Sequence, residues 1–276
     1  MKIALLQLNV SDDPAANLSN TLEMLDAAVA QGAEFVLTPE VTNCISTSRR
    51  HQNDVLALEQ DDKSLVALRK AAAHHGITLL IGSLGLKTTD EDGRFANRSF
   101  LIDGQGDIVA RYDKIHMFDV QVTPEETWRE SDGYRPGAQA VLANAGFAKI
   151  GMTICYDLRF PALHGALARA GAQILTVPAA FSPVTGAAHW HTLLRARAIE
   201  TGCYVIAPAQ TGEHASANHK TRKTYGHSLV VTPWGEVQLD AGTAPGVYTT
   251  VLDMEQVAKA RQKIPSLANA RPFDGP

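Results

Sequence analysis

The apolar residues of this chain follow two spacings: short continuous runs, typical of buried strands, and i, i+3, i+4 repeats, typical of helices. In the first half, the short runs predict strands at residues 2–10, 34–38, 77–81, 97–102 and 107–112. Two helices are expected between the first three strands. One begins at the capping pair Asp12-Asp13 and ends at Gly32, and the other begins at Asp61-Asp62 and ends at Gly76. Residues 104–106 read Gly-Gln-Gly, which predicts a hairpin between the last two strands.

The second half repeats this order of elements. Its predicted strands lie at residues 149–154, 173–177, 204–207, 228–231, 236–239 and 246–252. Helices at 161–169 and 187–201 separate the first three, and Thr-Pro-Trp-Gly at 232–235 predicts a turn. Strands that alternate with helices and end in hairpins favour mixed sheets with helices on one face. Two such layers packed sheet to sheet predict an α/β protein, a four-layer α-β-β-α sandwich.

The chain is predicted to contain one main domain. No Ser/Pro/Gly-rich linker separates the halves, so this domain is expected to cover residues 1–253. Residues 254–276 are interpreted as a C-terminal arm, extended after Ile264 and packed on a partner subunit. Two irregular stretches, 42–59 and 119–137, interrupt the pattern. Long irregular loops inside a compact domain are usually functional.

Composition narrows the class of protein. The 276 residues are 45% apolar and 20% charged, which is ordinary for a globular protein, and the net charge of −4 gives no reason to expect nucleic acid or an anionic membrane as a partner. Cys44, Cys155 and Cys203 are odd in number and widely spread, which favours a reducing compartment over a disulfide framework. The first ten residues resemble a strand rather than a secretory signal, and no apolar run is long enough to span a bilayer. A cytoplasmic location is therefore expected.

Three ionisable side chains come directly after predicted strands: Glu40 in FVLTPE, Lys114 in ARYDKIH and Cys155 in MTICYD. The carboxyl ends of strands gather at one edge of an α/β layer, so all three can line one pocket. The start of the helix that follows Cys155 is expected to favour its thiolate. From the residues alone, structural alternatives stay open: a small core residue for Cys155, a capping or surface acid for Glu40 and a solvated lysine for Lys114.

These residues, in this order and spacing, resemble the nitrilase superfamily of carbon–nitrogen hydrolases. The likeness covers nearly the whole chain and lies in TPE at 38–40, YDKIHMFD at 112–119, RES at 129–131, CYDLRFP at 155–161, HWHTLLRARAIETGCYV at 189–205 and YGHSLVVTPWGEV at 225–237. The sequence is most similar to the branch that contains deaminated glutathione amidase and ω-amidase. The resemblance implies an α-β-β-α sandwich, which agrees with the layers predicted above.

The resemblance also implies a role for each group. Cys155 is expected to attack an amide carbonyl, and Glu40 to take the thiol proton and return it to the leaving amine. The Lys114 ammonium and the backbone N–H of Tyr156 are expected to stabilise the oxyanion. Glu130 matches a second family glutamate that would orient Lys114 and the substrate; the alternative is an ordinary loop acid. No metal or organic cofactor is implied.

Other side chains are weaker candidates. Arg159 can bind a substrate carboxylate or pair with Asp157, and structural support of the turn is the favoured interpretation. Phe181 can form part of the pocket wall. His116 and His227 are interpreted as structural hydrogen-bonding residues rather than catalytic bases.

The predicted function is hydrolysis of a small linear amide through a thioester, with a carboxylate-bearing α-keto acid amide such as deaminated glutathione or α-ketoglutaramate as substrate. An N-carbamoyl amine hydrolase or a nitrilase of the same superfamily is the alternative, because the same nucleophile serves a ureido or nitrile carbon. A non-catalytic binding subunit is the alternative from a different class. The partners expected are the small-molecule amide and a second copy of the chain, in a homodimer or larger assembly.

Overall fold

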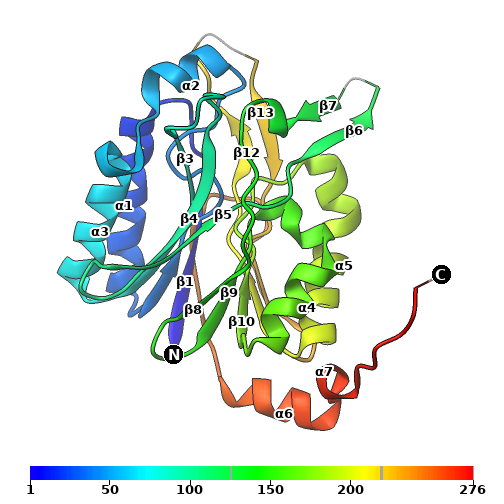
Figure 1. Cartoon of the computed structure of the whole chain (residues 1–276). Coiled ribbons are helices and arrows are strands. Elements are labelled where there is room, and N and C mark those ends of the chain that lie inside the picture. The colour runs from blue at the N-terminus through cyan, green and yellow to red at the C-terminus, as the bar shows by residue number, and fades with distance from the viewer. Residues whose placement is uncertain (125, 218–219, 276) are drawn as a thin grey trace.

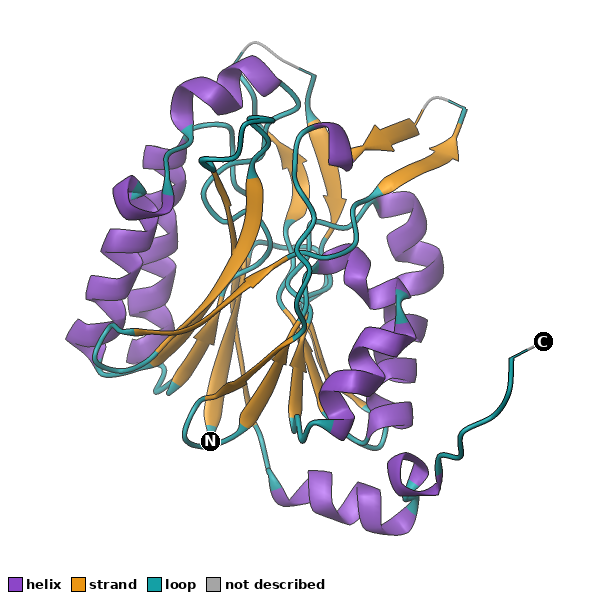
Figure 2. Cartoon of the chain, viewed as in Figure 1, coloured by secondary structure: helices purple, strands orange, loops and turns teal. Residues whose placement is uncertain are grey.

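The computed structural model describes residues 1–124, 126–217 and 220–275, and within them the chain forms two six-stranded mixed sheets. The two sheets pack face to face, and helices cover their outer faces, as Figures 1 and 2 show. The order of layers is therefore helix, sheet, sheet, helix. The predicted α-β-β-α sandwich is confirmed.

The first sheet comes from the N-terminal half and is completed by the last strand. Its order is β16 (Gly246–Val251), β1 (Lys2–Gln7), β2 (Phe35–Leu37), β3 (Thr78–Leu86), β4 (Ala96–Ile102) and β5 (Ile108–Asp113). Helices α1 (Pro14–Ala30) and α3 (Lys63–His75) cover its outer face (Figure 1). Asp13 and Asp62 accept hydrogen bonds from the first turns of these helices, and Gly76 ends α3 with a left-handed φ of 65°.

The second sheet comes from the C-terminal half. Its order is β15 (Val237–Asp240), β14 (Leu229–Val231), β11 (Tyr204–Ala207), β10 (Ile174–Thr176), β9 (Lys149–Met152) and β8 (Val141–Asn144). Helices α4 (Pro161–Arg169) and α5 (Pro183–Thr201) cover its outer face (Figure 1). The bounds of α4 and β11 are those that the sequence predicts, because both have uninterrupted patterns between clear end signals.

Alternation along the strands divides the apolar side chains between the layers. Ile3 and Leu5 of β1 belong to the same buried cluster as Met152 of β9 in the other sheet, whereas Ala4 and Leu6 belong to the cluster that α1 and α3 cover. Burying one large aliphatic side chain is worth about 1.5–3 kcal/mol. A slip of one residue would exchange the two faces, so this burial fixes the register and with it the level at which each strand ends.

Short elements at one end of the sheets were not predicted. They are α2 (Arg49–Val55), the 3₁₀ turns η1 (Glu59–Asp61) and η2 (Glu130–Asp132), the hairpin of β6 (Asp119–Thr123) and β7 (Glu126–Arg129), and the hairpin of β12 (Thr211–His214) and β13 (Arg222–Tyr225). Helix α2 buries no residue and β6 is exposed or half-buried throughout, so neither has an apolar period to detect. Both lie inside the stretches predicted to be irregular.

The C-terminal segment begins with helices. After β16 the chain forms α6 (Glu255–Lys263) and α7 (Ser266–Asn269), and an extended terminus follows (Figure 1). Val257 and Ala260 of α6 are buried, whereas Phe273 near the end is 90% exposed. Packing of residues 254–276 on a partner subunit stays a prediction. Among the described residues, every helix is too short or too polar to cross a lipid bilayer.

Candidate active site

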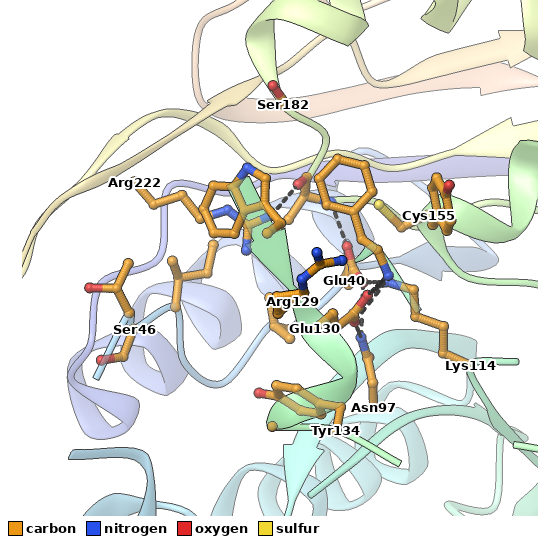
Figure 3. A pocket seen from close by; sticks show the side chains of 18 of the residues that line it. Glu40, Ser46, Asn97, Lys114, Arg129, Glu130, Tyr134, Cys155, Ser182 and Arg222 are labelled. Atoms are coloured by element: carbon orange, nitrogen blue, oxygen red, sulfur yellow. Dashed lines mark hydrogen bonds and ion pairs between the residues drawn. The ribbon is translucent and has the colours of Figure 1, made fainter. Parts of the chain in front are cut away.

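A pocket of about 370 Å³ opens where the loops after several strands meet (Figure 3). Glu40 follows β2, Lys114 follows β5 and Cys155 follows β9. Glu130 reaches the same pocket from η2, directly after the β6–β7 hairpin. The fold therefore brings together all four of the residues predicted to be catalytic.

The turn that carries Glu40 is fixed by its neighbours. Val41 adopts a left-handed φ of 49°, and its N–H donates to Oγ of Ser83 at 2.8 Å. Gly82 of β3 lies against the turn, where an added Cβ would stand only 2.1 Å from the carbonyl oxygen of Thr38. Only glycine permits this close approach of the two backbones. The Glu40 side chain is thereby held at one position, and the residue is 4% exposed.

The nucleophile candidate lies on a strained turn. Cys155 has a φ of 49° and begins the 3₁₀ turn η3 (Cys155–Arg159). A non-glycine residue in this region costs of order 1–3 kcal/mol and persists only where the surroundings enforce it. Its N–H donates to the Pro178 carbonyl at 2.9 Å, and the Asp157 carboxylate accepts from the N–H of Ile154 at 2.9 Å. These bonds hold the backbone while the thiol faces the pocket (Figure 3).

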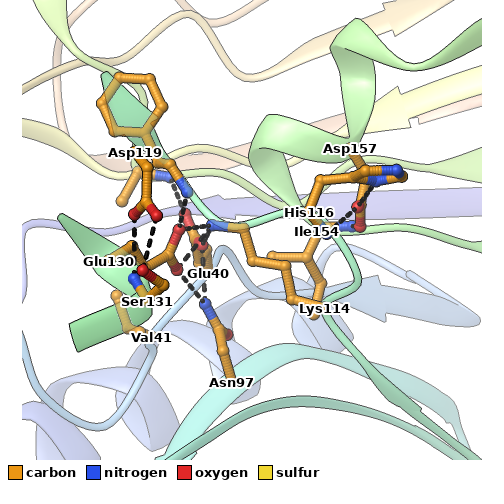
Figure 4. A network of polar contacts seen from close by, with 12 residues as sticks. Glu40, Val41, Asn97, Lys114, His116, Asp119, Glu130, Ser131, Ile154 and Asp157 are labelled. Atoms are coloured by element: carbon orange, nitrogen blue, oxygen red, sulfur yellow. Dashed lines mark hydrogen bonds and ion pairs between the residues drawn. The ribbon is translucent and has the colours of Figure 1, made fainter. Parts of the chain in front are cut away.

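Glu40, Lys114 and Glu130 form a buried charge cluster (Figures 3 and 4). Nζ of Lys114 lies 2.9 Å from Oε1 of Glu40 and 2.8 Å from each carboxylate oxygen of Glu130. Nδ2 of Asn97 donates to the same Glu40 oxygen at 2.9 Å, and the Ala180 N–H donates to the other at 2.8 Å. Lys114 is only 2% exposed, so the ammonium exchanges its hydration for these fixed partners.

The charges of the cluster keep Glu40 and Lys114 ionised. Burial alone would raise the pKa of Glu40, but the Lys114 charge and hydrogen bond, aided by Arg222, bring it below its ordinary value. Burial alone would lower the pKa of Lys114, yet Glu130 and Glu40 raise it well above its ordinary value. The pocket therefore contains a carboxylate able to accept a proton beside a permanent ammonium.

The Cys155 thiol keeps its proton, which corrects the expectation that a helix start favours its thiolate. Burial and the negative charge of Glu40 raise the pKa of Cys155 well above its ordinary value, and Lys114 offsets them only in part. The element after the cysteine is a short 3₁₀ turn, so little dipole opposes these effects. A thiol in this state needs a base to become nucleophilic, and it shares a hydrogen bond with Glu40.

Glu130 connects the cluster to the loop above it. Its Oε2 accepts from the N–H of Phe118 at 2.6 Å as well as from Lys114. The next residue, Ser131, is bonded to the Asp119 carboxylate through its N–H at 3.0 Å (Figure 4). The β6–β7 hairpin is thus anchored at its base to the same ammonium that contacts Glu40.

Asp157 does not pair with Arg159, which corrects one sequence-based alternative. The buried Asp157 carboxylate accepts from the Tyr112 hydroxyl at 2.7 Å, and it contacts Nδ1 of His116 at 2.7 Å (Figure 4). His116 is therefore a structural partner, as predicted. Arg159 instead lies 3.2 Å from Nδ1 of His189, with its guanidinium 5.7 Å from the centre of the Phe181 ring.

The other predicted pocket residues divide into two groups. Tyr156 and Phe181 line the pocket, whereas Arg159 is outside its described lining. Residues that line the pocket and were not predicted include Asn97, Trp128, Arg129, Tyr134 and Arg222. Asn97 opens a predicted strand, where a polar residue is unremarkable. Arg222 comes just before the YGHSLVVTPWGEV motif, and its position there was the one available signal.

A scan against family models matches residues 2–262 to the carbon–nitrogen hydrolase family, so the chain belongs to that family. It is a hydrolase that acts on carbon–nitrogen bonds other than peptide bonds, as predicted.

Curated relatives carry one recurring name. The deaminated glutathione amidase of Synechocystis sp. (strain PCC 6803 / GT-S) is 38% identical over 266 residues, which cover 96% of each chain. The Homo sapiens protein of the same name is 36% identical over 277 residues, covering 98% of this chain and 82% of its own. The predicted likeness to this branch is confirmed, and the carbamoyl-hydrolase and nitrilase alternatives are not favoured.

Solved structures agree with the fold. The C. elegans NitFhit protein has a TM-score of 0.90 at 34% identity and covers 98% of this chain, which spans 65% of that protein. Saccharomyces cerevisiae Nit3, described as a member of the nitrilase superfamily, has a TM-score of 0.83 at 28% identity, with 96% and 94% of the chains covered. A mutant amidase from Nesterenkonia sp. AN1, with a TM-score of 0.78 at 27% identity over 98% and 94% of the chains, carries an acetamide moiety covalently on its active-site cysteine.

Proposed function

We propose that this chain hydrolyses deaminated glutathione, or a related small α-keto acid amide, through a thioester on Cys155. The observation that carries the proposal is the convergence of the Cys155 thiol with Glu40 and Lys114 in one pocket. The shared name of the curated relatives supports the substrate.

The first half of the proposed reaction forms the acyl-enzyme. The Glu40 carboxylate takes the thiol proton as Sγ of Cys155 forms a bond to the amide carbon, and the carbonyl π electrons move to oxygen. Nζ of Lys114 and the N–H of Tyr156 stabilise this oxyanion. When the oxyanion collapses, the C–N bond breaks and the amine leaves with the proton that Glu40 held. The product on the enzyme is a thioester.

The second half releases the acid. Glu40, again a carboxylate, takes a proton from water, and the water oxygen attacks the thioester carbon. The C–S bond then breaks, the carboxylic acid leaves and the proton returns to sulfur. The enzyme is regenerated with no net change in charge or protonation. Because Glu40 is held by Lys114, Asn97 and the Ala180 N–H, the same carboxylate is in position for both halves.

Lys114 and Glu130 act as a positioning pair in this scheme. Glu130 contacts the ammonium with both oxygens, which fixes Nζ beside the Glu40 carboxylate. The pocket then presents one fixed positive donor where negative charge develops, and this kind of preorganised donor is worth about 10²–10³ in rate.

A carboxylate on the substrate is supported by the charges of the pocket wall. Arg129 and Arg222 both line the pocket, and the Arg222 guanidinium lies 4.9 Å from the centre of the Trp128 ring. A guanidinium held against an aromatic face is well suited to bidentate binding of a carboxylate. We assign that role to Arg222 rather than to Arg159, which is outside the described lining.

We also propose two further properties of the protein. The first is a homodimer or larger assembly, with residues 254–276 packed on the partner. The second is a cytoplasmic location. The Phe273 side chain supports the first, because its ring is 90% exposed and so is available to pack on a partner subunit. Free thiols at Cys44, Cys155 and Cys203 support a reducing compartment.

The substrate is tested with three matched compounds. Deaminated glutathione and α-ketoglutaramate are incubated with the purified chain, and glutathione, which has an amine in place of the keto group, serves as the control. We expect release of α-ketoglutarate from at least one of the first two and turnover of glutathione that is slower by about 10²-fold or more. If neither α-keto acid amide is hydrolysed, the substrate assignment is removed. Release of carbon dioxide from N-carbamoyl compounds instead would favour the related hydrolase class.

A further inference from the structure

A second cluster of chemically active side chains lies outside the catalytic pocket. His191 on α5, His227 between β13 and β14, and Asp240 at the end of β15 come together from three separate elements. Nε2 of His191 lies 2.9 Å from Oδ2 of Asp240, and Nδ1 of His227 lies 2.9 Å from Oδ1 of the same carboxylate. We refer to these three residues as the His–Asp–His cluster.

We propose that the His–Asp–His cluster binds one divalent transition-metal ion, of the class of Zn²⁺ or Ni²⁺. Two imidazole nitrogens and one carboxylate form a donor set that such ions prefer, whereas Mg²⁺ and Ca²⁺ prefer oxygen alone. The candidate donor atoms all lie within 4.8 Å of one another.

Two of the three donor separations need little adjustment to receive an ion, and the two imidazole nitrogens lie no more than 4.8 Å apart. Around an ion with bonds of about 2.0–2.1 Å, tetrahedral ligand atoms lie roughly 3.3 Å apart. The two nitrogen–oxygen separations of 2.9 Å would therefore open by a few tenths of an ångström. Each ring would bind the ion through the nitrogen that now faces the carboxylate, and the proton on that nitrogen would move to the other ring nitrogen, because a metal-bound imidazole is neutral.

The backbone at His227 is held as firmly as that of the nucleophile. With Cys155 and Val41, His227 is one of three non-glycine residues in the described chain with a positive φ, here 56°. Its N–H donates to the Gly242 carbonyl at 2.7 Å, and its carbonyl accepts from Nε1 of Trp190 at 2.8 Å. Strain kept in place by such bonds usually serves to aim a side chain, and here it aims the ring at Asp240.

Neighbouring groups also orient the side chains of His227 and Asp240. The Tyr225 ring stacks on His227 at 4.5 Å between centroids, and the Gly242 N–H donates to Oδ1 of Asp240 at 2.9 Å. Contacts of this kind fix the rings and carboxylates that bind metals, and losing them commonly weakens affinity 10–100-fold. The cluster is thus ordered before an ion arrives.

The cluster is open to solvent but separate from the catalytic pocket. Side-chain exposures of 35% for His191, 23% for His227 and 34% for Asp240 leave a path for an ion and room for water to complete its coordination. None of the three is among the described residues that line the catalytic pocket. A bound ion would tie α5 to the edge strand β15, so its expected effect is on stability.

The test uses the full-length chain without a purification tag, treated with chelator and then dialysed. We expect calorimetric titration with Zn²⁺ or Ni²⁺ to show one site per chain, a rise in Tm on binding and no response to Mg²⁺. His191→Ala and Asp240→Asn should each weaken binding 10-fold or more. Alanine is a strong helix former, so the first variant keeps α5 intact.

The matched control is His75→Ala. His75 forms a comparable pair with Asp26, with Nε2 2.8 Å from Oδ1, and it should leave metal affinity unchanged. Titration with Co²⁺ separates this cluster from the thiols, because sulfur ligation would give an intense near-ultraviolet charge-transfer band. Failure to bind Zn²⁺ or Ni²⁺ stoichiometrically, equal affinity in His191→Ala, or a thiolate band would each overturn the proposal.

Discussion

The two ends of the second sheet each hold a buried cysteine, and the comparison shows what distinguishes the proposed nucleophile from the other thiol. Cys155 comes after β9, at the pocket end, whereas Cys203 comes just before β11, at the opposite end. Burial raises the pKa of both thiols. The partner differs: Cys155 faces the Glu40 carboxylate, whereas the Cys203 sulfur donates to the Ala172 carbonyl at 3.2 Å. A neighbouring base, rather than burial or a low thiol pKa, distinguishes the proposed nucleophile Cys155 from Cys203.

Each thiol also has a cation beside it, with different consequences. Arg261 lies 3.1 Å from the Cys203 sulfur and also donates to the Ala172 carbonyl, so it connects α6 to the sheet. Lys114 instead lies between two carboxylates in an open pocket. A cation next to sulfur is structural in one region and, in the proposed mechanism, holds the oxyanion in the other.

The largest expected effect is the loss of activity in Cys155→Ala. Without the nucleophile we expect kcat to fall by about 10⁴-fold or more, because no acyl-enzyme can form. The matched variant Cys203→Ala should keep kcat within about twofold while losing roughly 1 kcal/mol of stability through its small cavity. Steady-state assays measure kcat, and denaturant unfolding measures the free energy of unfolding. Comparable activity losses in both variants would remove the distinction between the two ends of the sheet.

Lys114→Met is expected to lower kcat by about 10²–10³-fold through loss of the oxyanion donor. It also removes the cation from the buried Glu40 and half-buried Glu130 carboxylates. Because losing one partner of a buried ion pair costs about 3–5 kcal/mol, activity must be referred to the folded fraction measured by circular dichroism. Lys114→Arg keeps the positive charge and is therefore expected to fold. Its loss in kcat should be smaller than that of Lys114→Met, because the guanidinium still donates hydrogen bonds but from a different position. Arg261→Met, the equivalent change beside Cys203, should lower stability alone. A normal kcat in folded Lys114→Met would exclude the assigned role.

Arg222→Gln is expected to raise KM for an α-keto acid amide about 10-fold and to change kcat less. In the proposed role, the guanidinium would bind the remote carboxylate equally in the ground and transition states, so mainly uniform binding is lost. Arg159→Gln is the control, because Arg159 is outside the described lining. An amide without a carboxylate should be hydrolysed equally by the parent chain and Arg222→Gln. A larger KM effect in Arg159→Gln would reverse the assignment.

The smallest effect concerns pH. The pKa of Glu40 is below its ordinary value of 4.5, so the carboxylate stays available as pH falls from neutrality to below that value. Its contribution to stability is present above the unfolded pKa and is lost as pH falls through the folded one. We therefore expect that protonation of Glu40 causes no fall in kcat/KM above about pH 4.5. A fall in kcat/KM near pH 6 in the parent chain, together with no such fall in the residual activity of Glu40→Gln, would contradict this.

The sequence was sufficient for features with a local pattern. Helix α4 and strand β11 were predicted with the observed bounds, and the shared pocket of Glu40, Lys114 and Cys155 was predicted because each lies just past an apolar strand. Features that depend on distant partners were not found. Arg222 lies on a short strand with no apolar period, and its guanidinium packs against Trp128 of the distant β6–β7 hairpin.

Proximity in sequence also gave two wrong expectations. Asp157 and Arg159 are close along the chain, but the Asp157 carboxylate is satisfied by Tyr112 and His116, which come from the other sheet and the loop after it. The thiolate expected at Cys155 assumed a helix dipole. Burial and the Glu40 charge decide its protonation, and neither can be judged before the fold is known.

The most direct test of the central claim is mass spectrometry of the enzyme quenched in acid during turnover of an α-keto acid amide. We predict the mass of the acyl group on the peptide that contains Cys155, an unmodified peptide for Cys203, and loss of the adduct as substrate is exhausted. Turnover with no acyl group on Cys155, or with the acyl group on a different residue, would contradict the proposed mechanism.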